Sequence, residues 1–205
     1  MYKRFILAAA LAAAPHIAFA DGLSYTYVEG GYNKLHIDDE YLDSPEGDGG
    51  YLRGSVAISP SFYAFGSYAR VSNDFDTGIP GTQVDVSINQ SEIGLGYRQS
   101  MGDNLDFLTE LAFVREDLSA DMTGEGEIVD GQATGGRINV GVRGAMAPKL
   151  EGWLKVGYAD GGDFDGTFAG NAGVLFKFNP TWGMTGEVEV IEDTTRYLVG
   201  VRASF

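Results

Sequence analysis

The sequence has no cysteine among its 205 residues, which excludes a disulfide framework and any redox or metal site built from thiolates. Histidine is almost as scarce, with two residues, so a zinc site made of clustered imidazoles is excluded as well. Basic residues are also few: 14 Lys and Arg stand against 29 Asp and Glu, which gives a formal charge of −15. Nucleic acid is therefore not an expected partner, because its phosphates require a basic surface.

Long apolar runs are absent after residue 20, where no segment approaches the ~20 residues that a membrane helix needs. The first 20 residues have a different pattern. Two basic residues, Lys3 and Arg4, precede a short apolar stretch and the Ala18-Phe19-Ala20 motif. These are the three parts of a secretory signal peptide. We therefore expect residues 1–20 to be cleaved and residues 21–205 to form one exported domain.

The rest of the chain consists of short segments of alternating polarity that turn signals separate. Tight turns such as Ser59-Pro60-Ser61 and Asn179-Pro180-Thr181 alternate along the chain with longer segments rich in Asp, Glu and Gly. Short turns on one side and long loops on the other are typical of an outer-membrane barrel. The long loops are predicted at 36–50, 72–82, 116–135, 159–166 and 192–194. Ten strands are predicted near 23–36, 50–59, 62–73, 83–99, 105–117, 135–146, 149–159, 167–178, 182–192 and 195–205.

The predicted fold is all-β: a closed, antiparallel, up-and-down transmembrane barrel of ten strands, with an eight-stranded barrel as the alternative. Aromatic residues gather near both ends of the predicted strands, where the two interfaces of a bilayer would lie. One segment departs from regular alternation. Within 83–99 the phase slips between Ile88 and Glu92, which a bulge would explain.

The C-terminal segment is a strand whose odd positions are apolar or aromatic and whose even positions are mostly small or polar. In a closed barrel this last strand pairs with the first one, so no edge is exposed. The segment resembles the C-terminal signature of bacterial outer-membrane barrels. That resemblance implies an assembly signal, recognised by the barrel-assembly machinery, made of Tyr197, Val199, Val201, Ala203 and Phe205.

Six further segments carry a resemblance to a known family. They are 21–32, Arg53-Gly-Ser-Val-Ala-Ile-Ser-Pro60, Phe65-Gly-Ser-Tyr68, Glu92-Ile-Gly-Leu-Gly-Tyr97, Leu150-Glu-Gly152 and Lys177-Phe-Asn-Pro-Thr-Trp-Gly183. These segments are similar to those of small outer-membrane β-barrel proteins, a family once described as secreted quorum or diffusible-signal factors. The resemblance implies a membrane barrel and supplies no mechanism for signalling.

Charged residues fall on the face of the predicted strands that is opposite the apolar one. Acids and bases are almost equal in number there, so an ion-pair network that fills a narrow lumen is expected. A selective pore lined by charge is the alternative. The predicted lumen residues are Glu29, Arg53, Glu92, Arg98, Glu110, Arg137, Arg143, Glu151, Lys155, Lys177, Glu187, Glu189 and Arg202.

Most acids outside this set lie in the predicted long loops. Carboxylates are suited to hard cations, and the densest short cluster is Asp160, Asp163 and Asp165. The spacing is not that of a twelve-residue calcium loop, so a solvated loop is the better interpretation of this candidate cation site.

Enzymatic activity is not expected. His36 begins the first long loop beside Asp38 and Asp39, which leaves a hydrolase at the outer rim as a minor alternative. No serine lies in a nucleophile-elbow context, and no cofactor or metal motif is present.

The sequence thus predicts a monomeric barrel in the outer membrane of a Gram-negative bacterium, surrounded by outer-membrane lipids and lipopolysaccharide. Its expected role is structural or surface-interactive, through acidic extracellular loops, and a narrow pore for ions or small solutes is the alternative.

Replacing Phe205 with Asp should sharply reduce the amount of protein in outer-membrane fractions, because the change removes the final aromatic of the predicted assembly signal. Quantitative immunoblotting of separated membranes measures the effect, with Ser204→Asp as the control on the opposite face of the strand. Unchanged outer-membrane yield of Phe205→Asp would contradict the barrel prediction.

Overall fold

The computed structural model describes residues 23–37, 46–76, 82–124 and 126–205. The predicted signal peptide at 1–20 and parts of the predicted loops at 36–50, 72–82 and 116–135 lie outside these residues. Ten strands are present: β1 (Tyr27–Ile37), β2 (Glu46–Ala57), β3 (Phe62–Asp76), β4 (Gln83–Ser100), β5 (Leu105–Met122), β6 (Gly126–Ala147), β7 (Leu150–Gly161), β8 (Phe164–Lys177), β9 (Trp182–Ile191) and β10 (Thr194–Ser204). Among the described residues no helix is long and apolar enough to span a membrane.

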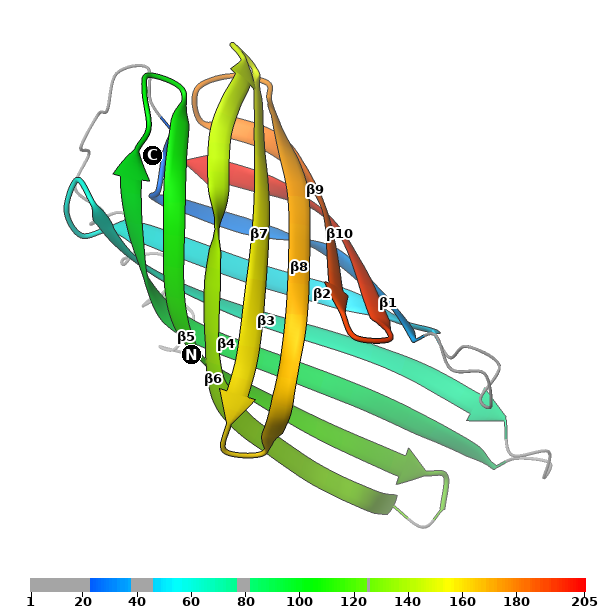
Figure 1. Ribbon diagram of the computed structural model, residues 1–205. Coiled ribbons are helices and arrows are strands. Elements are labelled where there is room, and N and C mark those ends of the chain that lie inside the picture. The colour runs from blue at the N-terminus through cyan, green and yellow to red at the C-terminus, as the bar shows by residue number, and fades with distance from the viewer. Residues whose placement is uncertain (1–22, 38–45, 77–81, 125) are drawn as a thin grey trace, which may run out of the picture.

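The strands form one closed antiparallel barrel in which each strand pairs with its neighbours in the sequence (Figure 1). Closure comes from β1 and β10, which are in register from Tyr27 with Ser204 to Ile37 with Thr194. The Phe205 N–H adds a hydrogen bond of 2.9 Å to the carbonyl oxygen of Thr26. The prediction of a ten-stranded up-and-down barrel is therefore confirmed, and the eight-stranded alternative is wrong.

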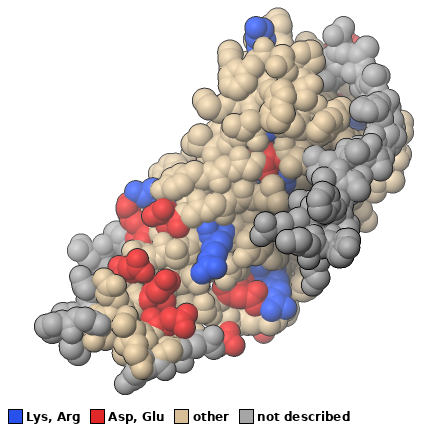
Figure 2. Space-filling model, turned by 180° about the vertical axis from the view of Figure 1, so that it is seen from behind, with Lys and Arg blue, Asp and Glu red and all other residues tan. Residues whose placement is uncertain are grey.

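Side chains are distributed in the reverse of the usual globular pattern. Outward positions carry large apolar side chains that are exposed, such as Ile93 at 68% and Phe168 at 76%. Inward positions carry buried charges, such as Glu29 at 2% and Glu151 at 1%. Figure 2 shows a broad band almost free of charged atoms, with acidic and basic residues gathered on one side of it. An apolar outer band around a polar interior is the pattern of a barrel whose surroundings are lipid.

Two hairpins, β3–β4 and β5–β6, project beyond the ends of β1, β2, β9 and β10 (Figure 1). The predictions of long loops at 72–82 and 116–135 were therefore wrong, since β3 continues to Asp76, β5 to Met122, and β6 begins at Gly126. The acids that suggested loops lie mostly on the outward face of these strands. We call the projecting part of these two hairpins the β3–β6 extension.

The bulge proposed between Ile88 and Glu92 is also absent, because β4 pairs with β3 and β5 in continuous register. Ile88 and Glu92 both face inward, but they lie in different parts of the barrel. Next to the lipid-facing band the inward residue is charged, whereas in the β3–β6 extension it is apolar. The irregularities of register lie elsewhere, between Ala120 and Asp121, Ala145 and Ala147, and Ala159 and Gly161.

Charge should be rejected on the outward face of the wall and tolerated on the inward face. Val140→Arg places a cation near the middle of the apolar band, where it should cost ~2–4 kcal/mol of unfolding free energy. Asn139→Arg, one residue away, points into the polar interior beside Glu110 and should cost much less. Urea unfolding in lipid vesicles measures both, and equal losses would show that the assignment of the two faces is wrong.

Candidate functional site

The interior of the barrel is a network of ion pairs to which every strand except β3 contributes a charged side chain. At its centre Arg53 binds Glu187 through both guanidinium nitrogens, at 2.9 and 3.0 Å. Arg202 donates to Glu29 at 2.6 Å, and the Tyr51 hydroxyl donates to the same carboxylate at 2.7 Å. Because Arg53 also lies 3.9 Å from Glu29, the two pairs form one connected group.

A second group lies on the opposite wall. Lys155 binds Glu110 at 2.7 Å, and this carboxylate also accepts a hydrogen bond of 2.8 Å from the Tyr63 hydroxyl. Nearer the long-hairpin end, Arg137 bridges Glu92 at 2.5 Å and Glu189 at 3.1 Å.

A third group lies near the tight turns. Arg143 binds Glu151 at 2.5 Å, and Lys177 approaches the other oxygen of the same carboxylate. Arg98 binds Asp106 at 3.0 Å. A buried ion pair requires good geometry to offset the desolvation of both charges, and removal of one partner leaves an uncompensated charge. The interior charges are therefore mutually dependent.

All thirteen residues that the sequence placed in the lumen face the interior, and each takes part in at least one ion pair. Two further members of the network, Asp106 and Arg196, were not predicted from the sequence. Arg196 lies 3.5 Å from Glu189. Both have the inward parity of their strands, since Asp106 is four residues before Glu110 and Arg196 six before Arg202. Alternation alone could have identified them.

Aromatic side chains stiffen the network from within. The Trp153 indole N–H lies 2.9 Å from Asn171 and 3.0 Å from Glu187, and its ring lies against the backbone at Gly173. A Cβ at Gly173 would come within 2.3 Å of that ring, so only glycine permits this close approach. Trp153 therefore depends on a glycine of the neighbouring strand for its position.

The segment before β1 packs inside the end of the barrel that carries the tight turns. Leu23 and Tyr25 lie inside the wall and form a buried apolar cluster with Tyr63 and Leu108. The rings of Tyr25 and Tyr63 are 4.9 Å apart. This segment was predicted as the start of a strand near residue 23, which is wrong, because β1 begins at Tyr27.

Polar contacts hold Tyr25 in this position from several strands. Its hydroxyl donates to Asp106 at 2.9 Å, and its carbonyl accepts a hydrogen bond of 2.8 Å from Ser55. The guanidinium groups of Arg98 and Arg143 lie over its ring, 4.6 and 4.9 Å from the centroid. Tyr25 has the odd number of the inward residues of β1, so alternation placed it as one more inward residue of a strand. Alternation gave no indication that the segment before β1 packs inside the barrel.

Little space is left in the interior. A cavity of about 90 Å³ lies between the ion-pair groups and is lined by Arg53, Glu110, Arg137 and Lys155 among others. It has room for about six to nine water molecules. The charged and polar side chains of its lining are suited to contact with water and small ions.

The other candidate sites are not assembled. Asp160 accepts a hydrogen bond from the N–H of Gly161, and Asp163 accepts two from Thr134. In the part of the chain that the structure describes, no group of three or more His, Asp or Glu is arranged so that it could hold a metal ion, and Asp160, Asp163 and Asp165 are not brought together as one. His36 lies 3.4 Å from Glu46 on the outside of the barrel, and Asp38 and Asp39 are outside the described residues.

The comparisons with known proteins support the fold. No family model matches the sequence, and no curated protein matches it. Among solved structures, the translocator domain of the autotransporter NalP from Neisseria meningitidis has a TM-score of 0.54 and 10% identity, covering 98% of this chain and 96% of that one. The Ail protein of Yersinia pestis has a TM-score of 0.45 and 11% identity, covering 89% and 99%. OprG from Pseudomonas aeruginosa has a TM-score of 0.46 and 12% identity, covering 90% and 98%.

Removing one member of an interior pair should destabilise the barrel more than removing both. Lys155→Met leaves Glu110 buried without its cation, and we expect a loss of ~3–5 kcal/mol and a lower unfolding temperature in detergent. The double variant Lys155→Met/Glu110→Gln should recover much of this loss, because no buried charge then lacks a partner.

Lys149→Gln, at an exposed tight turn, is the matched control and should leave the unfolding temperature unchanged. Additive losses in the double variant would show that Lys155 and Glu110 do not depend on each other.

Proposed function

We propose that the protein is a small, monomeric, integral barrel of a Gram-negative outer membrane, closed to solutes by its interior ion pairs, which acts at the cell surface. The observation that carries this proposal is the filled interior. Ion pairs from nine of the ten strands, the Trp153 ring and the Leu23–Tyr25 segment lie in the interior, where a pore would need open volume. A barrel that carries no solute is left with its external surface as the means of action.

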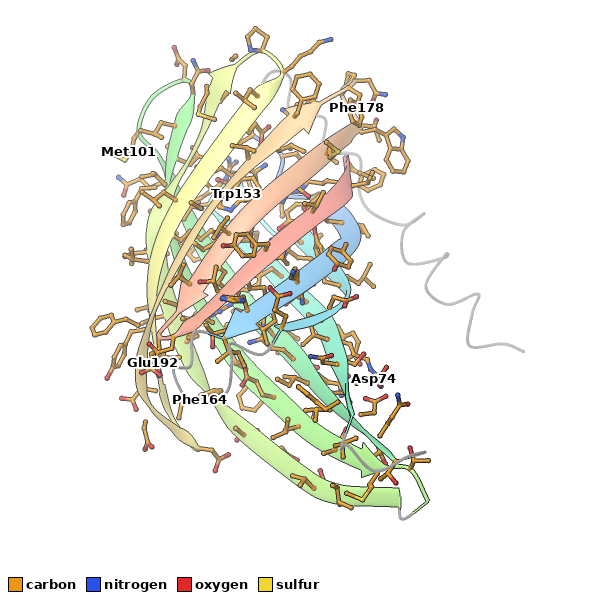
Figure 3. All side chains as sticks on the ribbon, turned by 90° about the vertical axis from the view of Figure 1, so that its right-hand side faces the viewer. Asp74, Met101, Trp153, Phe164, Phe178 and Glu192 are labelled. Atoms are coloured by element: carbon orange, nitrogen blue, oxygen red, sulfur yellow. The ribbon has the colours of Figure 1, made fainter. Side chains whose placement is uncertain are left out.

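The β3–β6 extension is the surface best suited to that role. Its outward positions carry acids on four adjacent strands, namely Asp74, Asp76, Asp85, Asp117, Asp121 and Asp130. Figure 3 places Asp74 and Glu192 at this end of the molecule, opposite Met101 and Phe178. Tight turns face the periplasm and long hairpins face outward in bacterial barrels, so the acidic end would face the exterior. An acidic surface favours cations or basic partners.

A narrow pore remains the second candidate, and the polar lining of the 90 Å³ cavity is the observation in its favour. Cavities lined by charged residues conduct when they connect both ends of a barrel. Here Tyr25 and Leu23 lie across the tight-turn end. The two candidates therefore differ in whether that end opens.

Conductance in planar bilayers discriminates between them. The purified wild-type protein should show no steady current, because the interior is filled from the tight-turn end upward. Tyr25→Ala removes the ring between Arg98 and Arg143 and should produce brief openings. Tyr32→Ala, on the outward face, is the control and should resemble the wild type. Steady, ion-selective wild-type currents that are missing from mock preparations would overturn the closed barrel in favour of the pore.

A further inference from the structure

The few cations of the chain are sharply divided between the two faces of the wall. Twelve Lys and Arg lie after residue 20, and eight of them form ion pairs in the interior. Lys149 lies at a tight turn. The remaining three, Lys34, Arg70 and Arg115, face outward near the long-hairpin end. In a chain with such an excess of acid, these three outward cations require an explanation.

Each of the three follows an exposed aromatic residue on the same strand. The pairs are Tyr32 and Lys34 on β1, Tyr68 and Arg70 on β3, and Phe113 and Arg115 on β5. Residues two apart share a face, so an aromatic ring and a cation follow one another along the outer wall three times. The other two strands that run in the same direction have an acid near this end in place of a cation. On β7, Asp160 follows Tyr158, and Glu192 follows the last residue of β9. The repeated pair is therefore confined to the wall from β1 to β5.

The strand register places the three cations at one height. Lys34 is level with Asp48 and Ser72, and Arg70 is two residues before Ser72. Arg70 is level with Asn89 and Asp117, and Arg115 is two residues before Asp117. Crossing two strands covers ~10 Å, which at a tilt of roughly 40° changes the height by ~6 Å. Two residues along a strand recover ~5 Å, so the stagger compensates the tilt.

The direction of this stagger is that of the barrel itself. Tyr27, the first residue of β1, is paired through Ser55 of β2 with Phe65 of β3. The first residue of β3 is Phe62, which lies three residues nearer the tight turns. A paired row of residues therefore rises away from the tight turns from β1 to β3. Lys34, Arg70 and Arg115 thus form a level row, named the basic rim below, with neighbours ~12 Å apart around the wall. Figure 2, seen from the side opposite β7 and β8, shows basic residues beside acidic ones just past the charge-free band.

The basic rim is available to an external anion. Arg70 makes no hydrogen bond or ion pair with any residue that the structure describes. Lys34 pairs with Glu46, and Arg115 with Asp117, each at 2.7 Å. The hydrogen bond from Lys34 lowers the pKa of Glu46, and that from Arg115 lowers the pKa of Asp117. Such exposed pairs contribute little free energy, so an anion can replace the carboxylate.

We propose that the basic rim binds the phosphates of a phosphorylated glycolipid, lipopolysaccharide, in the outer leaflet. This inference rests on the proposed outer-membrane location. The anion must be part of a lipid because the aromatic residue of each pair lies only ~7 Å along the strand from its cation. Aromatic side chains occupy the boundary of the hydrocarbon, so the cations lie at the depth of headgroup phosphates. Lipid bound in this way covers the β1–β5 wall and leaves the β7–β9 wall free of headgroup contacts.

Binding of lipopolysaccharide to the full mature chain, refolded in detergent, tests the inference by fluorescence anisotropy with a labelled lipid. Arg70→Gln should weaken binding roughly fivefold, and Lys34→Gln/Arg70→Gln/Arg115→Gln by about a hundredfold, at ~1 kcal/mol per cation. Lys149→Gln, an exposed cation at the opposite end, is the matched control and should bind as the wild type. Heat-modifiable migration on gels verifies that every variant is folded.

Two further arms identify the ligand chemistry. Dephosphorylated lipopolysaccharide should bind the wild type as weakly as the phosphorylated lipid binds the triple variant. Millimolar inorganic phosphate should compete poorly, and equal competition would show a site for free phosphate rather than lipid. A folded triple variant with wild-type affinity, or equal weakening by Lys149→Gln, would overturn the basic rim and leave the proposed outer-membrane barrel intact. Absence of the wild type from outer-membrane fractions would instead contradict the proposed function itself.

Discussion

The hydrogen-bond ladder between β1 and β10 is the interaction on which the rest of the structure depends. In hydrocarbon an unpaired N–H or C=O has no water to satisfy it, so a sheet can lie there only if it has no edge. Ten strands joined in this way define a wall with two separate environments. The outward apolar residues and the inward charges each become favourable only when that wall is complete.

In the middle of the barrel, ion pairs take the place of an apolar core, and the Leu23–Tyr25 cluster supplies a small one near the tight turns. A sheet closed on so few strands has an interior about as wide as its side chains, which must meet one another across it. Glu29, Arg53, Glu187 and Arg202 come from four separate strands and balance each other's charge. Such contacts add specificity as well as cohesion, because a strand shifted by one residue would direct its charges into lipid. The glycine opposite Trp153 has a comparable effect, since it fixes the depth of the ring against the neighbouring strand.

Alternation of polarity was sufficient to predict the number of strands, the closure and all thirteen inward charges. The strands concerned have lipid on one face and the lumen on the other, and these two environments favour opposite kinds of side chain. It failed where that contrast ends. In the β3–β6 extension both faces meet water or other protein, so Asp117 and Asp121 on one side of Leu118 and Ala120 indicated a loop rather than a strand. Tyr25 was missed for a different reason: its partners Asp106, Arg98 and Arg143 are distant in sequence, and only the closed barrel brings them together.

The meeting of residues 24 and 205 makes the backbone nearly cyclic. The Ser24 hydroxyl donates to the Phe205 carbonyl at 2.9 Å, and the Phe205 N–H binds Thr26. Linking these positions and cutting the chain at a tight turn such as the one before Trp182 would preserve every strand pairing. A circular permutant of this kind separates two properties that coincide in the natural order: the pairing of β10 with β1, which it keeps, and the place of β10 after β9 in the chain, which can be changed.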